Sequence, residues 1–271
     1  MATSREIVTC SLRFQHPERV PRDLWVLPIA NIAWPGAADA IARDFPSDFG
    51  RPDYTPPTLP HMKGDWYTPG EYTDEWGCTF FNIQPGVIGE VKRPLVETWA
   101  DLGKVRPPRE MLGKGMENVN RSCAQSDKFI LAGCCPRPWE RMQFIRGSAN
   151  LYMDLMDQPR ELFSLLNMVH EYYMEELEHW AKTDVDGITF MDDWGTQSAL
   201  QIPPPLWRQL FKPLYRDYCS LGHRYGKAMF FHSDGHIFEI YEDLIEVGVD
   251  AVNSQLFCMD IEEIGRRFKG R

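Results

Sequence analysis

The chain has 271 residues, of which 43% are hydrophobic and 25% are charged. This is the balance of a folded globular protein, so a largely disordered chain is excluded, and the length suits one large domain. The formal net charge of −10 makes a phosphate backbone an unfavourable partner. Binding to nucleic acid is therefore not expected.

The sequence carries no pattern that predicts export or insertion into a membrane. Residues 1–6 lack the apolar core of a signal peptide, and no run of about 18 apolar residues is present. The seven cysteines are odd in number and include no C-x-x-C pair. We therefore predict a cytoplasmic protein with reduced cysteines.

The first part of the chain, residues 1–125, is rich in Pro, Gly and Trp and shows little periodicity. A capping box formed by Thr3 and Glu6 predicts a helix near the start. Alternating apolar residues predict an antiparallel hairpin or a lid further along. The expected strand, loop and two arms of the hairpin lie, in this order, at residues 24–27, 46–68, 72–81 and 87–91.

The second part, residues 126–271, alternates between strands and helices with short connections. The predicted strands are 129–132, 187–191, 228–231 and 249–252, and the predicted helices are 139–156, 160–182, 205–224, 236–247 and 260–268. Such alternation indicates parallel strands with helical crossovers. An open doubly wound sheet would show the same pattern, but the glycine-rich dinucleotide and phosphate-loop motifs are absent, which favours a barrel.

Polar side chains follow three of these predicted strands. Asp192 and Asp193 follow the first, His232 and Asp234 the second, and Asn253 and Gln255 the third. In an α/β barrel these strand ends share the face on which active sites lie. Each group has a simpler interpretation: the carboxylates as loop caps, the histidine as a hydrogen-bonded core residue, and the amides as turn residues. The coincidence of three polar ends indicates an enzyme.

The chain resembles the uroporphyrinogen decarboxylase superfamily between about residues 70 and 270. The motifs that carry the resemblance are residues 186–188, 192–197, 211–213 with Trp207, 232–235 and 243–250, with 74–77, 140–141 and 146–147 upstream. The resemblance implies an α/β fold of the (β/α)8 TIM-barrel type, as a single domain over 1–271. About six strands can be counted, so we expect a barrel that lacks its last strands and helices at the C-terminus.

Two chemistries are found in the family that the chain resembles. True decarboxylases carry an N-terminal Arg-Gln-Ala-Gly-Arg segment for substrate carboxylates, which this sequence lacks. Arg137, Arg141 and Arg146 could replace it, or could be ion-paired helix residues. Corrinoid-linked methyltransferases often carry His-x-Cys and a later cysteine as zinc ligands. Here His232 is followed by Asp234, which puts a thiol-activating zinc site in doubt. Cys258 is a further candidate ligand, although packing is its simpler role.

The leading hypothesis is an enzyme of the methyltransferase branch. It would transfer a methyl group from a small methylated or methoxylated donor to a corrinoid carried by a partner protein. The alternatives are a decarboxylase that needs no cofactor and a non-catalytic binding barrel. The sequence is also compatible with a homo-oligomer. The predicted catalytic residues are Asp192, Asp193, His232 (also the expected zinc ligand) and Asp234. The predicted substrate-binding residues are Tyr72, Asp74, Trp76, Arg141, Arg146, Trp194, Gln197, Asn253 and Gln255.

Overall fold

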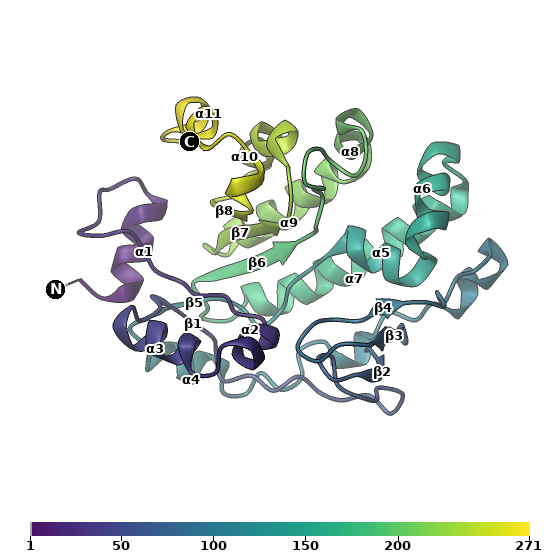
Figure 1. The fold of residues 1–271 in the computed structure, drawn as a ribbon, viewed down its shortest axis with the longest axis horizontal. Coiled ribbons are helices and arrows are strands. Elements are labelled where there is room, and N and C mark those ends of the chain that lie inside the picture. The colour runs from purple at the N-terminus through teal and green to yellow at the C-terminus, as the bar shows by residue number, and fades with distance from the viewer. Residues whose placement is uncertain (1) are drawn as a thin grey trace.

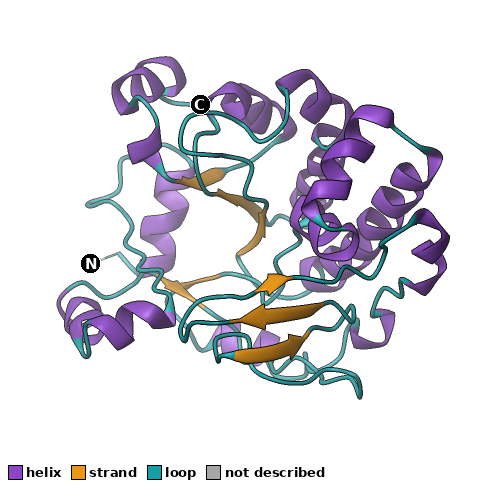
Figure 2. Cartoon of the chain, turned by 45° about the vertical axis from the view of Figure 1, so that its right-hand side comes forward, coloured by secondary structure: helices purple, strands orange, loops and turns teal. Residues whose placement is uncertain are grey.

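A curved parallel sheet forms the centre of the computed structural model, which describes residues 2–271 (Figures 1 and 2). Two segments, β1 and β5, pair with each other, and a bridge between Leu131 and Gly187 joins β5 to the sheet β6-β7-β8. We call the resulting order β1-β5-β6-β7-β8 the parallel arc. Its strands are β1 (Phe49–Gly50), β5 (Phe129–Ile130), β6 (Gly187–Met191), β7 (Ala228–Ser233) and β8 (Ala251–Ser254).

The register of the parallel arc brings its carboxyl ends to one level. Met191 pairs with His232, which pairs with Asn253. Two residues earlier, Phe230 is the partner of both Thr189 and Ala251. Side chains along a strand alternate between the two faces. These two rows therefore face the concave side together, and the intervening residues, such as Phe190 and Phe231, face the helices.

Helices cover the outer face of the parallel arc (Figure 1). The long helix α7 packs on α9 and on α5, and its buried residues recur at helical spacing. A capping box of Thr3 and Glu6 begins α1, as predicted. The helices are α1 (Ser4–Leu12), α2 (Pro28–Ala33), α3 (Ala37–Asp44), α4 (Val119–Ala124), α5 (Pro138–Arg146), α6 (Ser148–Asp157), α7 (Arg160–Ala181), α8 (Pro204–Leu210), α9 (Lys212–Arg224), α10 (Tyr241–Val247) and α11 (Ile261–Phe268).

An aromatic cluster fills the space between the sheet and these helices. The indole rings of Trp139 and Trp194 stack at 5.0 Å between centroids, and Phe211 packs edge-on against both. The ring of Tyr215 contacts Phe190 and Phe231 from the sheet. Large aromatic side chains supply most of the buried apolar area at such positions. The core thus fixes the loops that follow β6 and the helix that follows β5.

A small antiparallel sheet lies beside the parallel arc, in the order β2-β3-β4 (Figure 2). Its strands are β2 (Gly70–Thr73), β3 (Thr79–Asn82) and β4 (Glu90–Val91). The predicted hairpin is confirmed between β3 and β4, but its expected first arm, 72–81, is wrong as a single strand, because it contains the turn from β2 to β3. Among residues 2–271, no helix is both long and apolar enough to cross a membrane.

The α/β class is confirmed, but several predicted elements differ. Residues 24–27 form no strand: Leu24, Trp25 and Leu27 are exposed, and the chain turns into α2 at Pro28. The first parallel strand is β1 instead. The parallel strands number five rather than about six, and within residues 2–271 they form an open arc and not a closed eight-stranded barrel.

Two predicted helices are each divided in two. Gly147, at a φ of 78°, separates α5 from α6, because this backbone conformation ends a right-handed helix. A second break falls between α8 and α9, where Pro213 has no N–H to donate to the preceding turn. The strand predicted at 249–252 lies two residues later, as β8.

Candidate functional site

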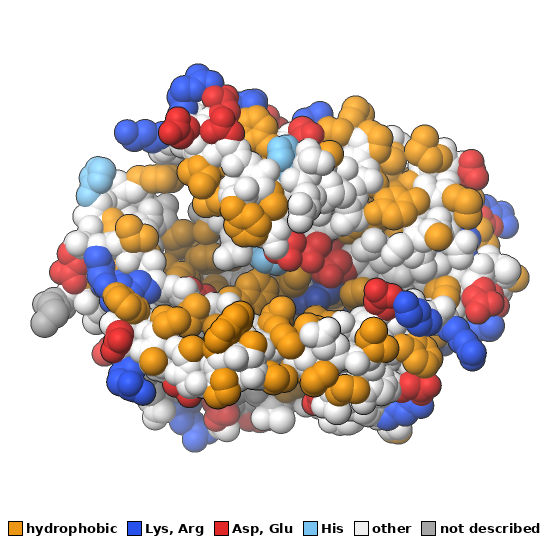
Figure 3. All heavy atoms as spheres, viewed as in Figure 1, with side chains coloured by type: hydrophobic (Ala, Val, Ile, Leu, Met, Phe, Trp, Pro, Cys, Tyr) orange, Lys and Arg blue, Asp and Glu red, His pale blue; other side chains and the backbone are white. Residues whose placement is uncertain are grey.

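A cavity of about 750 Å³ occupies the concave side of the parallel arc. It is lined by apolar residues of the strands and by polar residues at their carboxyl ends. Figure 3 shows a hollow across the middle of this face, with acidic and histidine side chains inside it. Trp25 packs edge-on against His232, with 4.7 Å between ring centroids, and forms part of the rim. A cavity of this volume suits a small molecule.

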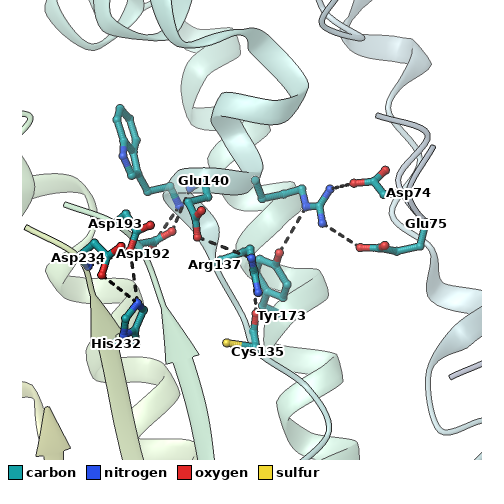
Figure 4. A network of polar contacts seen from close by, with 12 residues as sticks. Asp74, Glu75, Cys135, Arg137, Glu140, Tyr173, Asp192, Asp193, His232 and Asp234 are labelled. Carbon is teal, nitrogen blue, oxygen red and sulfur yellow. Dashed lines mark hydrogen bonds and ion pairs between the residues drawn. The ribbon is translucent and has the colours of Figure 1, made fainter. Parts of the chain in front are cut away.

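Three side chains converge at the carboxyl end of the parallel arc, and we call them the triad: Asp193, His232 and Asp234 (Figure 4). The His232 Nε2 atom lies 3.7 Å from Asp193 Oδ1 and 3.6 Å from Asp234 Oδ1. One ligand atom from each residue lies within 4.8 Å of the others. This is the convergence expected from the shared position of these residues beyond neighbouring strands.

Asn253 fixes the orientation and the tautomer of the His232 ring. Its Oδ1 atom lies 2.7 Å from His232 Nδ1 and can only accept a hydrogen bond, so the ring donates through Nδ1. In the neutral ring, Nε2 then carries the lone pair and faces the two carboxylates. A partner that holds the second nitrogen in this way is typical of a metal-binding histidine.

The loops after β6 and β7 hold the two carboxylates through backbone contacts. The Asp234 N–H donates to Asp193 Oδ1 over 2.9 Å, and the Gly195 N–H donates to the Asp234 carbonyl over 3.1 Å. Gly235 has a φ of 75°, and a Cβ there would lie 2.4 Å from the Gly195 carbonyl carbon. Only glycine fits this close crossing of the two loops. The triad is therefore built on a rigid base.

Negative charge accumulates beside the triad. Burial, with repulsion from Asp193, raises the pKa of the Asp234 carboxyl. Burial also raises the pKa of Glu140 to about 7, which the Arg137 guanidinium opposes and Asp193 reinforces. The Glu140 Oε2 atom is buried without a hydrogen-bond partner and lies 3.9 Å from Arg137 Nη1. Crowded carboxylates of this kind favour a proton or a cation between them.

The donor set of the triad suits a divalent metal with nitrogen and oxygen ligands. Zinc in catalytic sites takes three protein ligands from His, Asp, Glu or Cys and keeps one position open. The triad offers one imidazole and two carboxylates. Nitrogen and oxygen ligands of this kind suit zinc or a harder ion. They differ from the soft thiolate ligands of the His-x-Cys pattern. The Cys258 thiol lies 3.7 Å from Gln255 Oε1 and is not part of this group.

Asp192 does not line the cavity, contrary to prediction. Its side chain is fully buried and accepts the backbone N–H groups of Trp139 (3.1 Å) and Glu140 (2.9 Å) at the start of α5. The Tyr215 hydroxyl donates to the same carboxylate over 2.6 Å. The two backbone bonds stabilise the N-terminus of α5, and the Tyr215 bond satisfies the buried carboxylate from the side of α9. The simpler interpretation of this residue, a cap, is the one that the structure supports.

Two predicted substrate ligands near the small sheet serve the core instead. The Asp74 carboxylate is buried, accepts the N–H groups of Trp76 and Cys78, and pairs with Arg141. The Trp76 ring packs edge-on against Tyr172. Neither side chain lines the cavity, so the structure does not place them in a lid over it.

The remaining predicted arginine and tyrosine ligands also have structural partners. Arg146 is buried, pairs with Asp154 at 2.7 Å and donates to two backbone carbonyls. Tyr72 packs against Trp66 and Phe80. Arg141 does line a cavity, but a smaller one of about 300 Å³, and its guanidinium already pairs with two carboxylates.

Trp194, Gln197 and Gln255 follow the strands and were predicted to bind substrate, but none of them lines the larger cavity. Trp194 is fully buried, and its indole N–H donates to the Tyr215 hydroxyl over 2.7 Å. Gln197 is exposed on the loop after β6 and lines neither cavity. Gln255 accepts the Gly235 N–H over 3.0 Å and so supports the loop that carries Asp234. Asn253 alone of the predicted substrate ligands lines the larger cavity.

The prediction of site residues did not include Trp25 and Arg51, which line the cavity, or Glu140, which lies near the triad. Arg51 follows β1, whose two residues are too few to show a period. Trp25 lies on a loop that was predicted as a strand. Glu140 belongs to a motif of the family resemblance, and its position at the start of a helix after a strand was the available signal.

The comparisons with known proteins agree with this architecture. The structure is similar to that of a methyltransferase from Methanosarcina mazei, with a TM-score of 0.65 and 16% sequence identity over 98% of this chain and 80% of that one. At this identity the likeness concerns the fold. A search of curated proteins found no match. The family profile for uroporphyrinogen decarboxylase (URO-D) matches residues 73–268, which is more than half of the chain. The chain therefore belongs to the uroporphyrinogen decarboxylase family.

Proposed function

We propose that the chain is an enzyme that transfers a methyl group from a small methylated or methoxylated donor to a corrinoid carried by a partner protein. The triad carries this proposal, because it gathers one imidazole and two carboxylates at the edge of a small-molecule cavity. Zinc is the proposed metal, held by His232, Asp193 and Asp234. The fold likeness to a methyltransferase supports the same branch of the family.

The chemistry requires the donor's oxygen or nitrogen to keep an electron pair when the methyl group leaves. A bound divalent ion would act as a Lewis acid at that atom. The protein contributes the geometry: Asn253 orients the His232 ring, and the crossing loops hold both carboxylates. The apolar cavity wall excludes water from the donor.

Decarboxylation of a carboxylated substrate is the second candidate. It is favoured by Arg51 and Arg137, which line the same cavity and need no metal to bind a carboxylate. Uroporphyrinogen itself is a poor fit, because Arg141 and Arg146 are committed to buried ion pairs. We expect weak or absent turnover of uroporphyrinogen. A non-catalytic binding barrel is the third candidate, and it would bind small molecules without a metal.

A zinc titration of the chelator-treated chain tests the proposal, with free reduced cobalamin as methyl acceptor in a second assay. Asp234→Asn should weaken zinc binding at least about a hundredfold, since it removes a ligand. Asp217→Asn is the matched control, because Asp217 also contacts a histidine, His170, at 3.2 Å but on the surface. Equal zinc affinity in the two variants, together with no methylation of cobalamin by any methoxylated donor, would refute the proposed function.

A further inference from the structure

We propose that the donor carries a carboxylate and that Arg51 and Arg137 bind it, at the side of the cavity away from the triad. This inference rests on the proposed function and names its substrate class. The two arginines follow β1 and β5, whereas the triad follows β6 and β7. All of them lie at the carboxyl end of the parallel arc, and Arg51, Arg137 and His232 line the same cavity.

Arg137 has guanidinium donors to spare. Among residues 2–271 its one side-chain hydrogen bond runs from Nε to the Cys135 carbonyl, over 3.4 Å. Its Nη1 atom is 3.9 Å from Glu140 Oε2, which is beyond hydrogen-bonding distance. A guanidinium has five N–H donors, arranged as a planar fork that matches a carboxylate. The side chain is 23% exposed and lines both cavities, so a ligand can reach it.

Arg51 supplies a second cation with a fixed orientation. Its Nη1 donates to the Ala132 carbonyl over 3.0 Å, which holds the guanidinium against the end of β5. Both arginines line the cavity and bond the same short segment after β5, Arg51 through the Ala132 carbonyl and Arg137 through the Cys135 carbonyl. Arg141, by contrast, is neutralised by Asp74 and Glu75. The two cations at this side of the cavity are therefore Arg51 and Arg137.

The charge at the strand ends thus changes sign along the parallel arc, with cations after β1 and β5 and carboxylates after β6 and β7. Neighbouring strands lie about 4.8 Å apart, so β5 and β7 are roughly 10 Å apart. Between the two ends the cavity wall is apolar, with Leu131, Met191 and Phe230. This layout fits a small acid whose carboxylate is separated by an apolar body, such as one ring, from the methyl-bearing atom.

Calorimetric titration with para-methoxybenzoate and its neutral analogue para-methoxybenzamide tests the inference. The metal-free chain should bind the acid at least about tenfold more tightly than the amide. Arg51→Gln and Arg137→Gln should each remove most of this difference and leave amide binding unchanged. Arg160→Gln, at an arginine that is 92% exposed and far along the chain on α7, is the control and should change neither affinity.

Arg51 is exposed, so its variant should fold even if Arg137→Gln does not, and far-ultraviolet circular dichroism checks both. Equal affinity for acid and amide, no binding of either, or acid binding that is unchanged in both variants would overturn the carboxylate site. The titration needs neither metal nor corrinoid. If the chain binds the acid more tightly than the amide but never transfers a methyl group, the proposed function is refuted and the carboxylate site still stands.

Discussion

The two adjacent aspartates after β6 have opposite environments, although both were predicted to be catalytic. Asp193 shares its parity with the cavity-lining residues Thr189 and Met191 and lies beside His232, whereas Asp192 shares the parity of Phe190 and is buried. Neighbours in an extended segment point to opposite faces, so one of a pair can bind ligand while the other caps a helix. Asp193 therefore belongs to the triad, and Asp192 caps the N-terminus of α5.

Asn253 should affect metal binding without being a ligand. Asn253→Ala removes the acceptor of the His232 Nδ1 proton, so the ring loses its fixed orientation. Loss of such a partner typically lowers metal affinity about 10–100-fold. Zinc titration measures the change. Asn120→Ala is the control, because Asn120 also accepts one hydrogen bond, at 2.9 Å, from Asp184. An unchanged affinity in Asn253→Ala would show that the ring needs no second partner.

Glu176 should make stability depend on pH. Burial raises the pKa of its carboxyl from 4.5 to about 7, with Glu75 acting in the same direction. The folded state then binds more protons than the unfolded state between these values, so stability falls as pH rises through this window. Glu176→Gln should be more stable than the original chain by roughly 1–3 kcal/mol at about pH 8, and by little at about pH 4.

Denaturant unfolding at both pH values measures this difference. Glu171→Gln, at an exposed position of the same helix, serves as the control. An advantage for Glu176→Gln that is the same at both pH values would show that the effect comes from packing and not from ionisation.

At the scale of elements, the small sheet is joined to α5 by a buried ion pair. Arg141 on α5 pairs with Asp74 in the turn between β2 and β3, and both side chains are nearly inaccessible to solvent. The same carboxylate accepts two backbone N–H groups of that turn. Removal of one partner of a buried pair leaves the other charge uncompensated, which is a large cost.

Asp74→Ala should therefore lower the free energy of unfolding by about 3–5 kcal/mol. Glu71→Ala removes half of an exposed pair with Lys63 on the same sheet and should change it by less than about 1 kcal/mol. Urea unfolding of the two variants compares them directly. Similar losses in both would mean that Arg141 finds another partner, such as Glu75, when Asp74 is absent.

The elements with a clear apolar pattern were the predictable ones. Helix α7 has 22 residues, and its apolar period made it predictable within one residue. Strands β6 and β7 have five and six residues and were also predicted, and with them His232 and the triad. Strand β1 has only two residues. Its position depends on pairing with β5, which local sequence does not encode, so Arg51 could not be predicted.

At the scale of the whole molecule, the parallel arc has two open edges. Within residues 2–271, β1 pairs only with β5, and β8 pairs only with β7. An unpaired strand edge offers N–H and C=O groups to another chain. Large apolar side chains are exposed near one edge, including Phe257 after β8, which is 81% exposed. We therefore expect the chain to self-associate through the β8 edge.

Phe257→Lys should weaken this association, because a lysine beside an edge strand opposes pairing between copies. Ile83→Lys is the control: Ile83 is 96% exposed but follows β3 of the small sheet, away from the parallel arc. Sedimentation velocity over a range of concentrations measures the change. If Ile83→Lys dissociates the oligomer and Phe257→Lys does not, the interface lies on the small sheet.

The register that aligns Met191, His232 and Asn253 also makes the site sensitive to the length of β7. Insertion or deletion of a single residue between Lys227 and His232 would exchange the two faces of the strand beyond that point. The imidazole would then turn toward the helices, and an aromatic ring would enter the cavity. A single substitution in this strand alters one of the two faces, whereas a shift of one residue would remove the triad and disrupt the packing against α9 at the same time.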